Sequence, residues 1–282
     1  MTRRLGTSLS GAESASSDSI YVVMSKPLTE SVLRRLTTEA LVSYLGQSKR
    51  FELTMHSGCC LALTGEPVAD LNYLVAGRGA GDGDHFAAAC MTCISRSQPF
   101  LAMIFPEAGD SVERRAADLG LVHVVDFPFM VRDDAPIEPE GNDSVIVRRA
   151  AGPGGAEANV RVLSSAFGMP EGSVRHVLPA SLGDSPNLDI FLASIDDEVV
   201  GTVTLIHHGD TSGIWSMATD TARQRSGIGR RLLSTAMSEA RIQGAARFYL
   251  GATPAGYRLY ESLGFTTRTA AKVWASGETH QA

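Results

Sequence analysis

The chain has 282 residues, of which 44% are hydrophobic and 20% are charged, and its formal net charge is −6. These proportions are typical of a globular protein rather than a disordered or membrane protein. No apolar run approaches the roughly 20 residues that cross a bilayer, and no basic stripe is present to bind nucleic-acid phosphates. We therefore expect neither a membrane nor a nucleic acid as a partner.

The start of the chain predicts a disordered leader over residues 1–19, because this stretch is rich in Ser, Gly and Ala. Arg3 and Arg4 are not followed by an apolar segment, which argues against a secretory or twin-arginine signal. A cytoplasmic protein with reduced cysteines is the expectation that follows.

Residues 20–131 predict a first domain. Helices are expected over 36–48, 85–97 and 111–120, and strands over 50–56, 59–65, 70–77, 99–106 and 122–131. The cysteines are Cys59, Cys60, Cys90 and Cys93. A CxxC spacing can bind zinc or carry redox chemistry. Here the spacing places two thiols on one apolar helix face, which favours buried small hydrophobes and no metal site.

Residues 132–143, with two prolines and an acidic composition, predict a linker to a second domain over 144–282. Strands are expected over 144–150, 188–196, 198–208, 213–219, 247–253 and 265–275, and helices over 154–168, 170–178, 225–244 and 255–264. The first half repeats part of this order. PEAGDSVERRAADLGL in the first half also aligns with TPAGYRLYESLGF in the second. The sequence therefore predicts a tandem pair of related domains.

A glycine turn opens the long helix of the second half. Gly227 and Gly229 lie among four arginines, Arg223, Arg225, Arg230 and Arg231. Free amides at a helix N-terminus favour an anion such as a diphosphate. The alternative is a tight turn with a solvated basic face. A Rossmann fingerprint fails because Leu232 stands where a third Gly or Ala is needed, and no P-loop motif is present.

Two motifs together resemble the GNAT superfamily of N-acyltransferases. Gln224-x-x-Gly227-x-Gly229 is similar to the family's acyl-CoA-binding motif, and YRLYESLGF at 257–265 is similar to its second signature. The resemblance covers 144–275 well and the first half weakly. It implies an α/β (α+β) fold of two tandem GNAT-like domains. Each would have a mixed, mostly antiparallel twisted sheet flanked by helices.

The resemblance also implies a site for acetyl-CoA as co-substrate. Met217, Ala218 and Thr219 would bind the pantetheine arm on a strand that splays from its neighbour. The diphosphate would lie on the turn formed by Gln224, Arg225, Ser226, Gly227, Ile228, Gly229 and Arg230. Tyr260 would protonate the leaving thiolate, for which an aligned phenol is suited. Its alternative role is a buried aromatic beside Leu259 and Leu263.

Two features stay open at this point. His207 and His208 are weak candidates for the general base, because a lone surface histidine is more often a solvated loop residue. Thr253 stands where many GNAT members have Asn near the CoA arm.

The first half resembles a degenerate copy of the second. Its equivalent turn reads AGRGAGDGDHF, in which Asp82 and Asp84 would repel a diphosphate, and the alignment places Ala116 opposite Tyr260. We expect this half to bind no acyl-CoA. It would pack against the catalytic half, shape the acceptor site or replace a dimer partner.

The resemblance implies an acetyl-CoA-dependent N-acetyltransferase in which a primary amine of a small molecule or peptide attacks the thioester directly. The tandem arrangement also resembles that of mycothiol synthases. A non-catalytic acyl-CoA-binding regulatory or sensing protein is the alternative, and a thiol or metal protein is a third. The chain would be a monomer or a homodimer.

Overall fold

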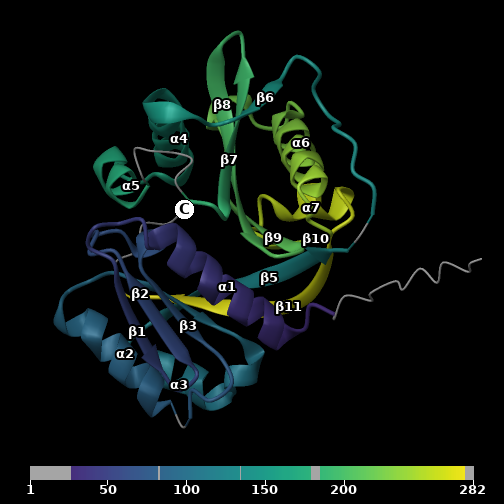
Figure 1. Ribbon diagram of the computed structural model, residues 1–282. Helices are drawn as coiled ribbons and strands as arrows, with labels where there is room; N and C mark the ends of the chain where they lie inside the picture. Colours follow the sequence, from purple (N-terminus) through teal and green to yellow (C-terminus); the bar gives the residue numbers. More distant parts are fainter. Residues whose placement is uncertain (1–26, 82, 134, 179–184, 277–282) are drawn as a thin grey trace, which may run out of the picture.

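The computed structural model describes residues 27–81, 83–133, 135–178 and 185–276, so the predicted leader lies outside the described residues (Figure 1). The α-helices are α1 (Glu30–Leu45), α2 (Asp84–Ser95), α3 (Asp110–Asp118), α4 (Gly152–Phe167), α5 (Glu171–Val177), α6 (Ile228–Ile242) and α7 (Tyr257–Ser262). The strands are β1 (Glu52–His56), β2 (Cys59–Leu63), β3 (Tyr73–Ala76), β4 (Leu101–Ile104), β5 (Val122–Arg132), β6 (Ile146–Arg149), β7 (Leu188–Ile195), β8 (Glu198–His208), β9 (Thr211–Thr219), β10 (Arg247–Gly251) and β11 (Thr266–Ala275). Short 3₁₀ turns lie at Ala69–Leu71, Pro106–Ala108 and Thr221–Arg223.

All of these strands belong to one 11-stranded sheet, in the order β1-β2-β3-β4-β11-β5-β10-β9-β8-β7-β6. β3 pairs with β4 in parallel, and β10 pairs with β9 in parallel. The other strand pairs are antiparallel. The prediction of a mixed, mostly antiparallel sheet flanked by helices is confirmed.

The two halves exchange their last strands. β5, which ends the first half, pairs with β10 of the second half. β11, which ends the second half, pairs with β4 of the first half, and β5 and β11 pair with each other (Figure 1). One continuous sheet therefore joins the two halves, and the boundaries at 131 and 144 remain a prediction.

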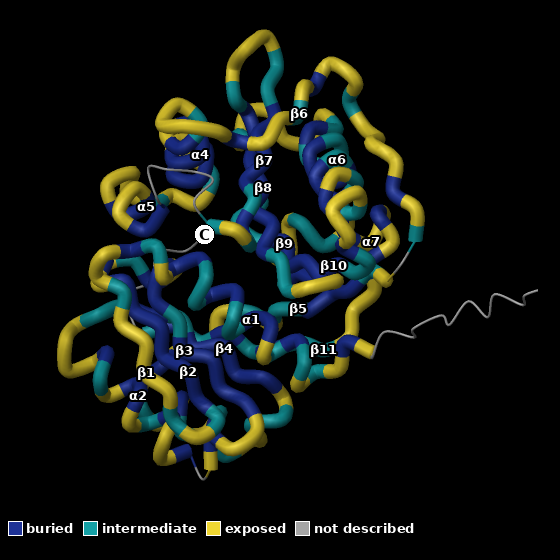
Figure 2. The backbone as a smooth tube through the Cα atoms, viewed as in Figure 1, coloured by how far each residue is buried: buried dark blue, intermediate teal, exposed yellow. Residues whose placement is uncertain are grey.

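Helices cover both faces of the sheet, in three core clusters. α6 and α7 pack on one face of the second half, and α2 and α3 pack on the first half. α1, α4 and α5 share a third cluster on the other side of the second half's strands. α1 contacts β2 and β3 of the first half as well as β8 and β9 of the second. Buried residues run through the central strands, whereas β1 at the edge is largely exposed (Figure 2).

The predicted elements are present, with two differences that have clear physical reasons. α1 begins at Glu30 rather than Leu36, because the Thr29 side chain caps the helix by accepting from the Val32 amide. The predicted linker starts within β5, which extends to Arg132. Ile137 of this segment is buried in the α6 core cluster, so the segment docks onto the second half.

All four cysteines are buried free thiols, which confirms their interpretation as small hydrophobes. Burial raises the pKa of Cys59, Cys60 and Cys93 to about 11. No group of His, Cys, Asp or Glu among the described residues could hold a metal ion. In the same part of the chain, no helix is long and apolar enough to cross a membrane.

Candidate functional site

β9 and β10 separate partway along their length. Their pairing runs from Thr211 with Arg247 to Ile214 with Leu250, but β9 continues to Thr219. The chain after β10 turns to β5 instead, since the Ala252 amide donates to the Pro128 carbonyl at 2.8 Å. The edge of β9 that carries Met217, Ala218 and Thr219 therefore has no β10 partner. An extended ligand can bind such an edge as an additional strand.

A β-bulge lies at the point of separation. Thr202 of β8 faces Ala218 and Thr204 faces Trp215, so β9 carries one extra residue between these pairs. Ser216 sits there with a φ of 46°, in the left-handed region. Its hydroxyl donates to the Tyr44 hydroxyl of α1 at 2.9 Å, so a side chain from the first half holds the bulge.

The turn before α6 presents its backbone amides without protein acceptors. Among the described residues, the amides from Arg225 to Arg230 donate no hydrogen bond. Gln224, Arg225 and Ser226 are exposed, whereas Ile228 is buried and anchors the helix start. Amides at a helix N-terminus carry the positive end of the helix dipole. The turn can therefore hold an anion.

The two glycines serve different local needs. Gly227 is the N-cap of α6, with a φ of 81° that residues with a Cβ adopt only under strain. Gly229 is needed for packing, because a Cβ there would lie 3.2 Å from Met217 Cε and 3.3 Å from Leu259 Cδ2. Gly229 thus brings the amide turn close to the free part of β9.

Three of the four arginines around the turn are paired with carboxylates. Arg223 contacts Glu198 at 2.6 Å. Arg230 contacts Glu140 at 2.7 Å, and Arg231 lies 3.6 Å from Asp143. The two acidic partners of Arg230 and Arg231 come from the segment predicted as a linker. Arg225, with a φ of 60°, is exposed and makes no ion pair within the described ranges.

Tyr260 faces the free part of β9. It lies on α7 with an exposed fraction of 7%, and its hydroxyl is 3.7 Å from the Met217 sulfur. Its ring packs edge-on against Phe265 at 6.1 Å. Burial raises the pKa of Tyr260 to about 12, so the phenol is protonated at neutral pH. The structure thus brings together Tyr260, the predicted pantetheine strand and the predicted diphosphate turn.

His207 and His208 are engaged elsewhere. The His207 ring lies 2.8 Å from the Ser212 hydroxyl and 3.1 Å from Asp189. The His208 ring is 3.4 Å from Glu39 and 3.4 Å from the Tyr249 hydroxyl, and burial lowers the pKa of His208. Tyr249, the partner of His208, packs in the core cluster that contains α1. Tyr260 packs in the separate cluster that contains α6. These contacts do not favour either histidine as the base.

Residues of β5 contact the elements around this site, and sequence reasoning did not find them. Phe127 of β5 lies against Gly251, where an added Cβ would be 2.0 Å from the Phe127 ring. Arg132 donates to the Leu263 carbonyl at the end of α7 at 2.7 Å. These contacts follow from strand exchange, for which no local sequence signal exists.

The chain matches known families and structures over these same elements. The Acetyltransferase (GNAT) domain model matches residues 186–267. No protein in the curated set matches the chain.

Solved structures match over most of the chain. A GCN5-related N-acetyltransferase from Kribbella flavida is 18% identical with a TM-score of 0.66, covering 88% of this chain and 96% of that one. A GCN5-related N-acetyltransferase from Sphaerobacter thermophilus is 18% identical with a TM-score of 0.58, covering 78% and 76%. A tandem GNAT protein from the clavulanic acid biosynthesis pathway is 10% identical with a TM-score of 0.52, covering 90% and 98%. These likenesses establish a tandem GNAT fold.

Proposed function

Because residues 186–267 form a GNAT acetyltransferase domain within a tandem GNAT fold, we propose that the chain is an acetyl-CoA-dependent N-acetyltransferase. Its acceptor would be a primary amine of a small molecule or peptide. One observation carries the proposal: the Tyr260 hydroxyl reaches Met217 on the part of β9 that β10 leaves unpaired.

The binding of acetyl-CoA is assigned to two surfaces. The free edge of β9, at Met217, Ala218 and Thr219, would pair with the amides and carbonyls of the pantetheine arm. The amides of the turn from Gln224 to Arg230 would hold the diphosphate, with the exposed Arg225 side chain as an additional cation. The side chain of Arg230 is already paired with Glu140, so Arg230 would contribute through its amide.

Acetyl transfer then requires a proton donor for the leaving group. The amine nitrogen forms a bond to the thioester carbonyl carbon, and the carbon–sulfur bond breaks. Tyr260 would give its phenolic proton to the departing sulfur, the amine would lose a proton to solvent, and the Tyr260 phenolate would regain a proton from solvent. Burial disfavours a thiolate for the same reason that it raises the pKa of Tyr260 to about 12. Both pKa values would rise together, so the gap of roughly 1.5 units between an ordinary phenol and an ordinary thiol would change little.

The first half would form part of the acceptor side. Tyr44 holds the bulge at Ser216, and Phe127 lies on Gly251 where β10 ends. Both contacts belong to the face of the sheet that α1 covers, since their residues pack in the α1 core cluster. An acceptor entering there would meet aromatic side chains from the first half.

Calorimetric titration of acetyl-CoA into the full chain tests the proposal. We expect one equivalent to bind, followed by release of a free thiol when amines are screened as acceptors. The protein's own thiols are buried, so a thiol reagent reports the product. Absence of saturable acetyl-CoA binding would refute the proposal.

A further inference from the structure

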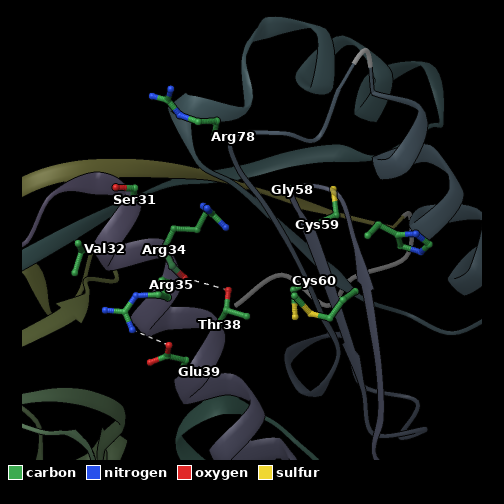
Figure 3. Close-up of a pocket in the computed structure, with 12 residues that line it drawn as sticks. Ser31, Val32, Arg34, Arg35, Thr38, Glu39, Gly58, Cys59, Cys60 and Arg78 are labelled. Carbon is green, nitrogen blue, oxygen red and sulfur yellow. Dashed lines mark hydrogen bonds and ion pairs between the residues drawn. The ribbon is translucent and has the colours of Figure 1, made fainter.

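A cavity lies in the first half, and none of its lining residues belongs to the predicted diphosphate turn. It has a volume of about 560 Å³ and opens between α1, the β1–β2 hairpin and the turn after β3 (Figure 3). This volume lies within the range of small-molecule sites, roughly 300–1,000 Å³. The proposed function assigns no role to this cavity.

Three arginines line the cavity, and each has a carboxylate partner. Arg34 and Arg35 come from α1, and Arg78 comes from the turn after β3. Glu39 is the carboxylate among the lining residues. Burial raises the pKa of Cys59 and Cys60 to about 11, so these thiols add no negative charge at neutral pH.

The arginines keep donors available for a ligand. Arg34 uses its Nε to donate to Glu107 at 2.5 Å, and its terminal nitrogens make no hydrogen bond among the described residues. In Figure 3 its guanidinium projects from α1 into the space beside Gly58. Arg78 is 84% exposed and lies 3.8 Å from Glu107. Arg35 donates to Glu39 through one nitrogen at 2.7 Å.

Glu107 fixes the position of the Arg34 side chain. Its side chain is 9% exposed, and it holds Arg34 across Gly77, where an added Cβ would lie 2.1 Å from Arg34 Cδ. A guanidinium held in one orientation loses little entropy when it binds a planar carboxylate or a phosphate. Val32 of α1 and Met55 of β1 add apolar side chains to the lining.

We propose that this cavity binds a small oxyanion ligand, a carboxylate or phosphate compound, between Arg34, Arg35 and Arg78. The proposal is independent of acetyl-CoA binding, because it uses none of the residues of the second half. α1 connects this cavity to the bulge, since the same helix carries Tyr44.

Titration calorimetry with succinate and with inorganic phosphate, each into the full chain, tests the proposal and separates the two chemistries. We expect saturable binding of at least one probe. Arg35→Ala and Arg78→Ala should each raise its Kd about tenfold. Both side chains are largely exposed, at 58% and 84%, so these variants should remain folded. Arg34 is left intact because its loss would leave Glu107 buried without its cation.

Two controls identify the site. Arg114→Ala removes an exposed arginine on α3, and it should leave the Kd unchanged. Gly227→Ala alters the turn before α6 and should also leave it unchanged, which separates this site from the predicted diphosphate site. The proposal is wrong if neither probe binds at low millimolar concentration. It is equally wrong if Arg35→Ala and Arg78→Ala bind as the parent does.

Discussion

The two halves share one order of strands and α-helices from β1 to β5 and from β7 to β11, but they differ where a parallel strand pair ends. β3 pairs with β4 from Tyr73 to Ala76, the last residue of β3, and the Phe105 amide extends the ladder by donating to the Ala76 carbonyl. β9 leaves β10 after Ile214 and continues to Thr219. Among the described residues, the free strand edge next to a helix N-terminus therefore lies in the second half.

Side chains close the corresponding space in the first half. The ion pair of Arg34 with Glu107 lies over Gly77, immediately after β3. The helix that follows also begins with a glycine, Gly83, whose φ of 93° resembles that of Gly227. Its first turn, however, carries Asp84, which is paired with Arg115 at 2.8 Å. Within the part of the chain that the structure describes, the turn before α6 thus has free amides, whereas its equivalent before α2 carries an ion-paired aspartate.

The largest expected effect comes from separating the halves. A fragment of residues 144–282 lacks β5, whose Phe129, Met130 and Val131 are each 1% exposed. Burying three such side chains contributes roughly 5–9 kcal/mol, comparable with the whole stability of a domain at about 5–15 kcal/mol. We expect the fragment alone to be unfolded and to bind no acetyl-CoA.

Co-expression with residues 1–143 provides the control for this experiment. The two pieces should assemble through β5 and β11 and regain one acetyl-CoA site, measured by calorimetry and circular dichroism. A fragment that binds acetyl-CoA as tightly as the full chain would show that the exchanged strand is dispensable.

The next largest effect is expected at Tyr260, where the first half has Ala116, a buried residue of α3. Tyr260→Phe removes the proton donor but keeps the ring against Phe265. We expect kcat to fall about 100-fold while the Kd for acetyl-CoA stays the same. Tyr257→Phe on the same helix is the matched control, because its hydroxyl contacts Thr267 instead. Equal turnover in the two variants would remove Tyr260 from the mechanism.

The pH dependence of turnover gives a second test of the role of Tyr260. Its pKa is raised to about 12 by burial, and a raised pKa keeps the phenol protonated as the pH increases. Turnover should therefore not decline through loss of this proton up to about pH 10, the ordinary pKa of a phenol.

Local sequence patterns predicted the elements and the turn before α6, but not the partners of β5 and β11. The two strands are equivalent members of the repeat, so exchanging them changes no pattern of periodicity or turn residues. Register and partner depend on contacts distant in sequence, such as Phe127 with Gly251 and Arg132 with Leu263. For the same reason, local sequence patterns did not predict the ion pair of Arg230 with Glu140. A segment with a linker's composition supplies that carboxylate.

The smallest effect is expected at the two equivalent N-cap glycines, Gly83 of α2 and Gly227 of α6. They also give the closest comparison of the two halves. Gly227→Ala and Gly83→Ala each place a Cβ at positive φ, at 81° and 93°, with nearest contacts of 3.2 Å and 3.1 Å. Both should cost about 1–2 kcal/mol of unfolding free energy. Only Gly227→Ala should raise the Kd for acetyl-CoA, by about tenfold, because it alters the amides that we propose hold the diphosphate. If both variants weaken binding equally, the effect is general destabilisation and the turn before α6 loses its assigned role. If neither does, the diphosphate lies elsewhere, and the difference between the two halves must rest on the free edge of β9 alone.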